Sequence, residues 1–311
     1  MPQKHMKASL KRFKESYFFY SFKRDKVAMV SFIILVLFLL LSIGAPIISP
    51  YNPYDSANID IMNSEIPPAW YEEGSTQFLL GTDNMGRDLL STMFYGLRIS
   101  VMIGLGAVFL QAMIGIMVGL TAGYVGGKVD AVLMRMADIQ FSFPYLMVAI
   151  FISAVFQILF GIGSYEKLAV PLLVVIIGLS EWPVYARTIR ASVMGEKNKE
   201  YVEAARVIGL SRPVIMVRHV LPNTLTSVMV ISTIQVANAV MSEAALSFLG
   251  LGMPVTMPSL GSLIKSGFEY IFSGIWWITI FPGIFLILFV LVINLLGDWM
   301  RDVLNPKLYK G

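Results

Sequence analysis

The chain has 311 residues, of which 56% are hydrophobic and only 14% are charged, with a formal net charge of +4 and a mean hydropathy of +0.71. Soluble domains have about 25% charged residues, and a core of this size cannot hide so much apolar surface from water. These numbers exclude soluble globular, disordered and coiled-coil proteins. The apolar runs are long and continuous, which also excludes a transmembrane β-barrel with its alternating strands of about 10 residues. The remaining class is an all-α integral membrane protein.

Six apolar stretches are candidates to cross a bilayer, which takes roughly 20 residues. The expected spans are residues 28–49, 98–122, 137–160, 168–187, 223–247 and 275–297. The fourth span reaches this length only if Glu181 lies near its polar end. Residues 244–264 are also uncharged, but their glycines and prolines are typical of a loop.

These spans predict the organisation of the whole chain. The expected parts are a basic amphipathic cytoplasmic N-terminus (1–26), a first transmembrane helix (27–49), an external loop (50–96), a core of five transmembrane helices (97–297) that contains a cytoplasmic loop (187–222), and a cytoplasmic tail (298–311).

The distribution of lysine and arginine predicts the orientation. If both chain ends are inside, all but four of the 24 lysines and arginines lie on inner segments. The exceptions are Arg87, Arg98, Lys167 and Lys265. Because basic residues concentrate on the cytoplasmic side, we expect both termini to be cytoplasmic. Residues 7–26 mix basic and aromatic residues, which suits either a helix at the inner membrane surface or an ordinary basic flank that sets orientation.

Several kinds of chemistry lack the residues that they need. The chain has no cysteine and two histidines, which excludes disulfides and thiolate metal sites. It has no phosphate-binding loop, since Gly127-Lys128 lacks both the first glycine and the following hydroxyl residue of that motif. Glu181, Glu243 and Asp138 lie near span ends, so no chain of ionisable groups crosses the membrane. This pattern favours an externally driven conduit over an ion-coupled carrier.

The cytoplasmic loop 187–222 carries a short helical motif. Its Glu-Ala-Ala run favours a helix and the glycine after it can end that helix, while a Leu-Pro pair leads into the fifth span. The residues concerned are Glu203, Ala204, Ala205, Gly209, Leu221 and Pro222. From the residues alone, this segment is either a connector or a contact for a partner.

A second motif, Leu-Gly-Thr-Asp-Asn-Met-Gly-Arg-Asp, lies in the external loop. Its distinctive residues are Gly81, Asp83, Gly86, Arg87 and Asp88. Two acidic residues around a glycine can indicate calcium, but the segment lacks the number of ligands that an EF-hand supplies. We therefore expect a structured turn.

Polar residues in the fifth span are candidates for a translocation path. Gln235 and Asn238 lie within the span, and Glu243 lies beyond them. These side chains either face a conduit or hold helices together by hydrogen bonds.

Small residues and a proline predict details of helix packing. Gly115, Gly119 and Gly123 recur every four residues, which predicts a close helix–helix contact. Pro144 either kinks the third span or is merely tolerated there.

Taken in order along the chain, these motifs resemble one family. The Glu-Ala-Ala, glycine and Leu-Pro elements of 203–222 are similar to the cytoplasmic signature of bacterial ABC importer permeases. Residues 80–88, 246–252 and 294–306 resemble segments of peptide-importer permeases, and the nearest subgroup is the dipeptide/oligopeptide permease of the "C" type, which is related to nickel permeases. The resemblance extends from residue 22 to residue 308.

The resemblance implies a type I ABC importer permease fold in the bacterial cytoplasmic (inner) membrane. It implies a heterodimer with a homologous permease, two cytosolic ATPase subunits that bind ATP and magnesium, and an external solute-binding protein. This chain would bind no cofactor, metal or nucleic acid and would have no catalytic residue. Residues 203–209, with Leu221 and Pro222, would couple to an ATPase, and the fifth span would line the path.

The cargo that the resemblance implies is a di- or oligopeptide. Nickel or an oligosaccharide on the same machine is the nearest alternative. An ion-coupled carrier or channel that acts alone is the alternative from a different class.

Overall fold

The computed structural model of the chain describes residues 17–55 and 59–304, and helices dominate this part. Five helices are long and apolar enough to cross a membrane: α3 (Lys26–Ile48), α4 (Leu89–Val125), α7 (Ile162–Glu196), α10 (Leu221–Phe248) and α12 (Trp277–Val303). The pair α5 (Gly127–Ser142) and α6 (Tyr145–Phe160) makes a sixth crossing if the two helices form one bent span. The expected all-α membrane class is confirmed.

Shorter elements connect the long helices. They are α2 (Tyr17–Arg24), α8 (Glu200–Val207), α9 (Arg212–Ile215), α11 (Leu260–Phe268), the 3₁₀ turns η2 (Ile61–Asn63) and η4 (Ile271–Ser273), and the π-helical turn η3 (Met216–Val220). Residues 1–16 of the predicted N-terminus and 305–311 of the predicted tail lie outside the described residues.

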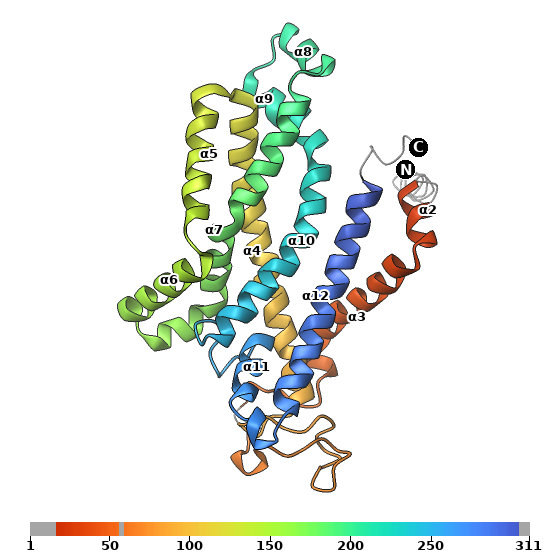
Figure 1. Cartoon of the computed structure of the whole chain (residues 1–311), viewed down its shortest axis with the longest axis vertical. Coiled ribbons are helices and arrows are strands. Elements are labelled where there is room, and N and C mark those ends of the chain that lie inside the picture. Colours follow the sequence, from red (N-terminus) through yellow and green to blue (C-terminus); the bar gives the residue numbers. More distant parts are fainter. Residues whose placement is uncertain (1–16, 56–58, 305–311) are drawn as a thin grey trace.

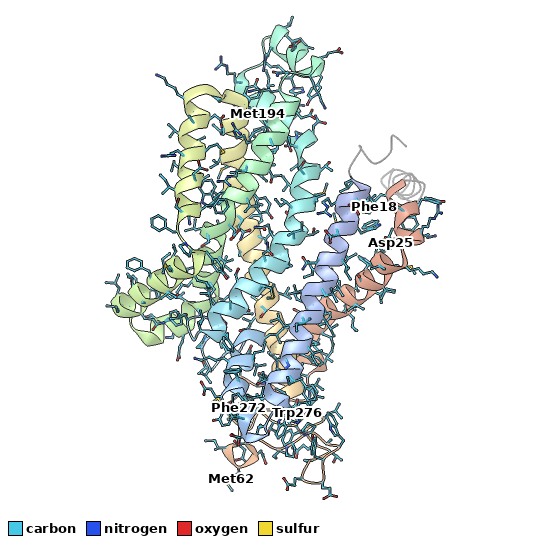
Figure 2. The ribbon with its side chains drawn as sticks, in the orientation of Figure 1. Phe18, Asp25, Met62, Met194, Phe272 and Trp276 are labelled. Carbon is cyan, nitrogen blue, oxygen red and sulfur yellow. The ribbon has the colours of Figure 1, made fainter. Side chains whose placement is uncertain are left out.

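The long helices form an elongated bundle with different structures at its two ends (Figure 1). Helix α8 lies at one end, and the loop that follows α3 lies at the other end together with α11. Labelled side chains mark these two ends in Figure 2. Met194 lies toward the α8 end of α7, while Met62 and Phe272 lie at the opposite end. The loop predicted to be external and the loop predicted to be cytoplasmic are therefore at opposite ends of the molecule.

Glycines allow α4 and α7 to pack closely against each other. A Cβ atom at Gly115 would lie 2.3 Å from Cβ of Tyr185, and one at Gly119 would lie 2.4 Å from the carbonyl oxygen of Ala186. Both positions are tighter than real Cβ atoms allow, so only glycine lets α4 and α7 approach this closely. The close packing predicted from the four-residue glycine spacing is confirmed.

The segment expected as the third span is broken. Helix α5 ends at Ser142, and α6 leaves it at an angle of 81°. The break occurs where Pro144 precedes α6 and Phe143 is extended, with φ −100° and ψ 126°. A proline disfavours helical backbone in the residue before it, so Pro144 does more than kink the helix.

Other helix ends also differ from the expected spans. Helix α4 begins at Leu89, earlier than the expected 98, because Asp88 caps it. Helix α12 continues to Val303, into the segment expected as tail. The glycine- and proline-rich loop that follows α10 contains α11, which starts with a capping box between Ser259 and Ser262.

Candidate functional site

Helix α8 is held to the rest of the chain by one face. Val202 and Ala205 are buried, and their spacing of three residues places both side chains on the same side of the helix. Glu203 and Ala204 are exposed and point away from this anchored face. The helix therefore presents its acidic and small residues at the end of the molecule (Figure 1).

Gly209 ends α8 with a left-handed turn. Its φ is +87°, a conformation that glycine adopts without strain. The Gly209 N–H donates to the carbonyl of Arg206 at 2.9 Å, and the Leu210 N–H donates to that of Ala205 at 3.2 Å. This pair of bonds is a Schellman motif. A Cβ atom at position 209 would meet nothing within 4 Å, so the chain itself leaves space at this turn.

A polar network ties α8 to both neighbouring long helices. The hydroxyl of Tyr201 donates to the carboxylate of Glu196 on α7 at 2.6 Å and accepts from the side-chain amide of Asn223 on α10 at 3.2 Å. Burial and the Glu196 carboxylate raise the pKa of Tyr201 to about 12, so the hydroxyl stays protonated at neutral pH. Two hydrogen bonds therefore connect α8 to α7 and α10.

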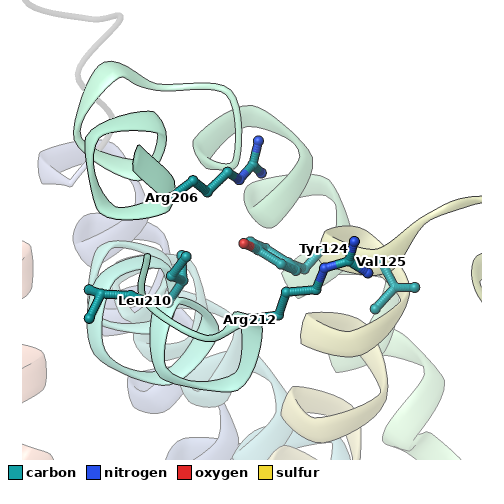
Figure 3. A pocket seen from close by; sticks show the side chains of 6 residues that line it. Tyr124, Val125, Arg206, Leu210 and Arg212 are labelled. Atoms are coloured by element: carbon teal, nitrogen blue, oxygen red, sulfur yellow. The ribbon is translucent and has the colours of Figure 1, made fainter. Parts of the chain in front are cut away.

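A cavity of about 430 Å³ lies beside α8 (Figure 3). Arg206 and Arg212 line it together with Tyr124 from the end of α4. The Arg206 guanidinium lies 5.6 Å from the ring centroid of Tyr124, which is cation–π geometry. It also donates to the carbonyl of Lys197 at 3.2 Å. The cavity is thus cationic and lies at the same end as α8.

The Leu-Pro pair begins α10 after a widened turn. The Leu221 N–H donates to the carbonyl of Met216, five residues earlier, which closes the π-helical turn η3. Pro222 lacks an N–H, and its ring would clash with the carbonyl four residues earlier in a regular helix. The π turn accommodates Pro222 and lets α9, η3 and α10 run on as one segment, Arg212–Phe248. Leu221 and Pro222 therefore shape the start of α10.

The motif of residues 80–88 contains a buried ion pair. The Arg87 guanidinium donates to the Asp83 carboxylate at 2.7 Å, with both side chains almost completely buried. Arg87 also donates to the carbonyl of Val255, between α10 and α11, at 2.9 Å. The other Asp83 oxygen accepts from the backbone N–H groups of Met85 and Arg87. The pair thus connects the loop between α3 and α4 to the segment after α10.

The rest of this motif shapes a turn and caps α4. Gly81 and Gly86 have φ of +82° and +77°, and a Cβ atom at Gly86 would lie 2.0 Å from the carbonyl oxygen of Asp60. The Asp88 carboxylate accepts from both the N–H and the hydroxyl of Ser91. Burial raises the pKa of Asp88 above its usual value, and the hydrogen bonds from Ser91 offset only part of this shift. The carboxylates of the motif thus bind Arg87 and the start of α4.

Two of the three polar candidates of the fifth span are buried between helices. Glu243 accepts from the hydroxyl of Ser100 on α4 at 2.7 Å and from Ser247 at 2.6 Å. Gln235 is also buried and donates to Gln111 on α4 at 3.2 Å. Asn238 is exposed, although its amide donates to Gln235 at 2.9 Å.

The comparisons with known families cover most of the chain. The profile of the family described as "Binding-protein-dependent transport system inner membrane component" matches residues 115–310. This chain belongs to that permease family. Residues 16–68 also match the family described as "N-terminal TM domain of oligopeptide transport permease C". The permease identity predicted from the four motifs is confirmed.

Relatives from several bacteria match this permease over nearly its full length. The di/tripeptide transport system permease protein DppC of Pseudomonas aeruginosa is 37% identical over 291 residues, 94% of this chain and 91% of that one. The dipeptide permease DppC of Escherichia coli K12 is 38% identical over 94% of this chain and 92% of its own length. The oligopeptide permease OppC of Bacillus subtilis is 34% identical over 93% of this chain and 88% of its own length.

A solved structure supports the fold. An inward-facing structure of the MetNI methionine ABC transporter aligns with a TM-score of 0.56 and 19% identity over 69% of this permease and 97% of that chain. The type I ABC importer permease fold implied by the motifs is confirmed.

Sequence reasoning missed the partners of the buried polar groups. Ser100 and Gln111 on α4 meet Glu243 and Gln235 on α10, more than a hundred positions away. Gln111 was visible as a polar residue inside an apolar span, which marks a helix contact. Ser100 gave no such signal.

Proposed function

We propose that this permease is the C-type subunit of an ATP-driven importer of di- and oligopeptides. The observation that carries the proposal is similarity over 94% of the chain to permeases named for dipeptides and tripeptides, together with the match of residues 16–68 to the N-terminal domain of oligopeptide permease C. The chain has no phosphate-binding loop. Two partner ATPases would therefore bind ATP and magnesium, and a second, homologous permease would complete the path.

In this proposal α8 is the contact for an ATPase subunit. Its anchored face and its exposed Glu203 and Ala204 support this role, since small residues let a partner surface approach closely. The Schellman turn at Gly209 fixes the end of the helix, and the Tyr201 network joins it to α7 and α10. Nucleotide-driven movement of the ATPases would then tilt these long helices and alternate access between the two sides.

The proposed path lies on the side of α10 that faces out of this chain. Asn238 is the exposed member of the three polar candidates and would face the homologous permease. Gln235 and Glu243 would hold α10 against α4. The solute-binding protein would deliver cargo at the opposite end from α8, where the Asp83–Arg87 pair fixes the external loop.

Uptake in proteoliposomes tests this function. The permease is reconstituted with its partner permease, both ATPases and the solute-binding protein, with ATP on the ATPase side and radiolabelled dialanine or trialanine on the other. We expect ATP-dependent accumulation of peptide, which stops when the catalytic glutamate of the ATPases is changed to glutamine. ATP-dependent uptake of nickel or of an oligosaccharide, with no uptake of peptide, would contradict the cargo.

A further inference from the structure

An apolar slot of about 410 Å³ lies where α2 meets α3, α10 and α12. This volume is within the range of small-molecule sites. Its walls include Phe22, Phe32 and Leu296. Among the described wall residues, only Thr233 and Trp299 carry an O–H or N–H group in the side chain. The Thr233 hydroxyl donates to the carbonyl of Val230 at 2.8 Å. The remaining surface is suited to a hydrocarbon chain.

Aromatic contacts hold the walls of the slot in place. Phe18 and Phe22 of α2 make edge-on contacts with Trp299 of α12, with ring centroids 4.7 and 5.3 Å apart. Phe22 also contacts Phe32 of α3 at 5.5 Å. Phe18 lies beside the end of α12 (Figure 2). Helix α2 is therefore packed across two long helices, and the slot between them is a formed feature.

The indole N–H of Trp299, in the wall of the slot, has no hydrogen-bond acceptor among the described residues. The Trp299 side chain is 9% exposed, and its Nε1 is buried. Buried donors in proteins nearly always have an acceptor, because an unmade hydrogen bond costs free energy. Because this nitrogen is itself closed off from the surroundings, a ligand oxygen reaches it only after neighbouring side chains shift, and the ring of Trp299 contributes to the slot as an apolar wall.

Basic residues lie at the junction of α2 and α3, two of the helices that line the slot. Lys23 and Arg24 end α2, Lys26 begins α3, and all three side chains are exposed. The intervening Asp25 caps α3, and its carboxylate accepts from the N–H of Ala28 at 3.0 Å. At the nearby end of α12, Arg301 pairs with the two aspartates beside it. The Lys23 ammonium also lies 4.9 Å from the ring centroid of Phe19. With Asp25 included, this junction keeps an excess of positive charge, at the membrane side predicted to be cytoplasmic.

We propose that this slot binds an anionic phospholipid of the inner leaflet. One acyl chain occupies the apolar cavity against the ring of Trp299, and the headgroup phosphate pairs with Lys23, Arg24 and Lys26. Charge decides the class of lipid, because juxtamembrane basic clusters attract anionic headgroups. The lipid would connect α2 to α12.

Fluorescence quenching by brominated lipid tests the site. In the assembled importer, Trp70, Trp182, Trp276 and Trp277 are changed to phenylalanine so that Trp299 is the permease's reporter, and the partner subunits likewise carry phenylalanine for tryptophan. The complex is placed in nanodiscs that contain rising fractions of phosphatidylglycerol or phosphatidylcholine with brominated acyl chains. We expect half-maximal quenching at a much lower fraction of phosphatidylglycerol than of phosphatidylcholine.

Charge variants identify the binding residues. Changing Lys23, Arg24 and Lys26 to glutamine one at a time should each weaken the preference for phosphatidylglycerol about fivefold. Lys128→Gln and Arg135→Gln are matched controls, because both are exposed basic residues on α5 and neither lines the slot. We expect the controls to keep the wild-type preference.

Three results would overturn the proposal. Equal quenching by both lipids would mean that Trp299 meets only bulk lipid. No quenching by either would mean that protein, either residues 1–16 or the partner permease, fills the slot. Equal loss of preference in the control variants would mean general surface charge. As an independent measurement, mass spectrometry of the unmodified purified complex should detect retained phosphatidylglycerol or cardiolipin, and this retention should fall in the Lys23→Gln, Arg24→Gln, Lys26→Gln triple variant.

Discussion

Substitution at Gly209 tests how the end of α8 contributes to transport. The residue has φ +87° and closes the Schellman turn. An added Cβ atom meets nothing within 4 Å in this chain, so an alanine causes no internal clash. The intrinsic effect of that substitution is therefore confined to the backbone. Any further effect must come from a partner surface.

The backbone cost follows from the left-handed conformation. An alanine there costs roughly 1–2 kcal/mol, which lowers the population of the native turn about 5–30-fold relative to competing turns. A β-branched valine costs more, while asparagine tolerates this conformation. If the turn itself matters for coupling, Gly209→Asn should therefore lose the least uptake, Gly209→Ala should lose more, and Gly209→Val should lose the most.

Steric exclusion by a docked ATPase gives a different order. Alanine would then be the mildest change, and asparagine would be nearly as damaging as valine because their side chains are of similar size. The assay is peptide-stimulated ATP hydrolysis and peptide uptake by the reconstituted complex. Gly274 provides the matched control, since its φ is +88° and a Cβ atom there also meets nothing within 4 Å. It caps η4, whose Phe272 lies at the opposite end of the molecule from α8 (Figure 2). Wild-type coupling in all three Gly209 variants, or an equal loss in the Gly274 series, would refute the reasoning.

The remaining predictions concern orientation and the buried polar groups. Because the chain has no cysteine, Glu72→Cys should react with an impermeant maleimide from outside and Asn198→Cys only after the membrane is opened; the reverse pattern would contradict the orientation. Arg87→Met leaves the buried carboxylate of Asp83 without its cation and should destabilise the complex by about 3–5 kcal/mol in thermal unfolding, with the Asp83→Asn, Arg87→Met double variant regaining part of that loss. Glu243→Gln should retain uptake, whereas Glu243→Ala leaves its partners unsatisfied and should lose roughly 1–3 kcal/mol of stability; an assembled Gln variant without uptake would assign Glu243 a transport role.

The sequence predicted the features that depend on local composition. Apolar runs of sufficient length located the long helices, and the Glu-Ala-Ala run with Gly209 located α8 and its end. The glycine spacing at 115 and 119 predicted a close contact because only small residues allow it. These features were predictable because each depends on residues that are neighbours along one helix.

Features that depend on distant residues were not predictable. Pro144 marked the position of the break, but the 81° angle between α5 and α6 depends on how each helix packs. Residues 137–160 were therefore predicted as one span, with or without a kink at Pro144. Helix α11 was missed because its capping box uses Ser262, where the usual signal is glutamate or glutamine.

The same limit applies to the candidate site. Whether Gln235, Asn238 and Glu243 face a path or a neighbouring helix depends on the rotation of α10 about its axis. Hydropathy did not fix this rotation, since polar and apolar residues alternate around the helix without a distinct apolar face. The structure places Ser100 opposite Glu243 and leaves Asn238 exposed.

Cross-linking from α8 tests most directly whether this helix is the contact through which ATP hydrolysis drives the permease. Ala204→Cys places a thiol on the exposed face of α8 in a chain without natural cysteine, and a maleimide–benzophenone reagent can then capture whatever lies against it. Gln77→Cys, exposed in the loop at the opposite end, is the control. If α8 contacts an ATPase subunit, we expect a covalent product between the permease and that subunit from position 204 and none from position 77. An intact complex in which position 204 captures no ATPase would contradict this expectation.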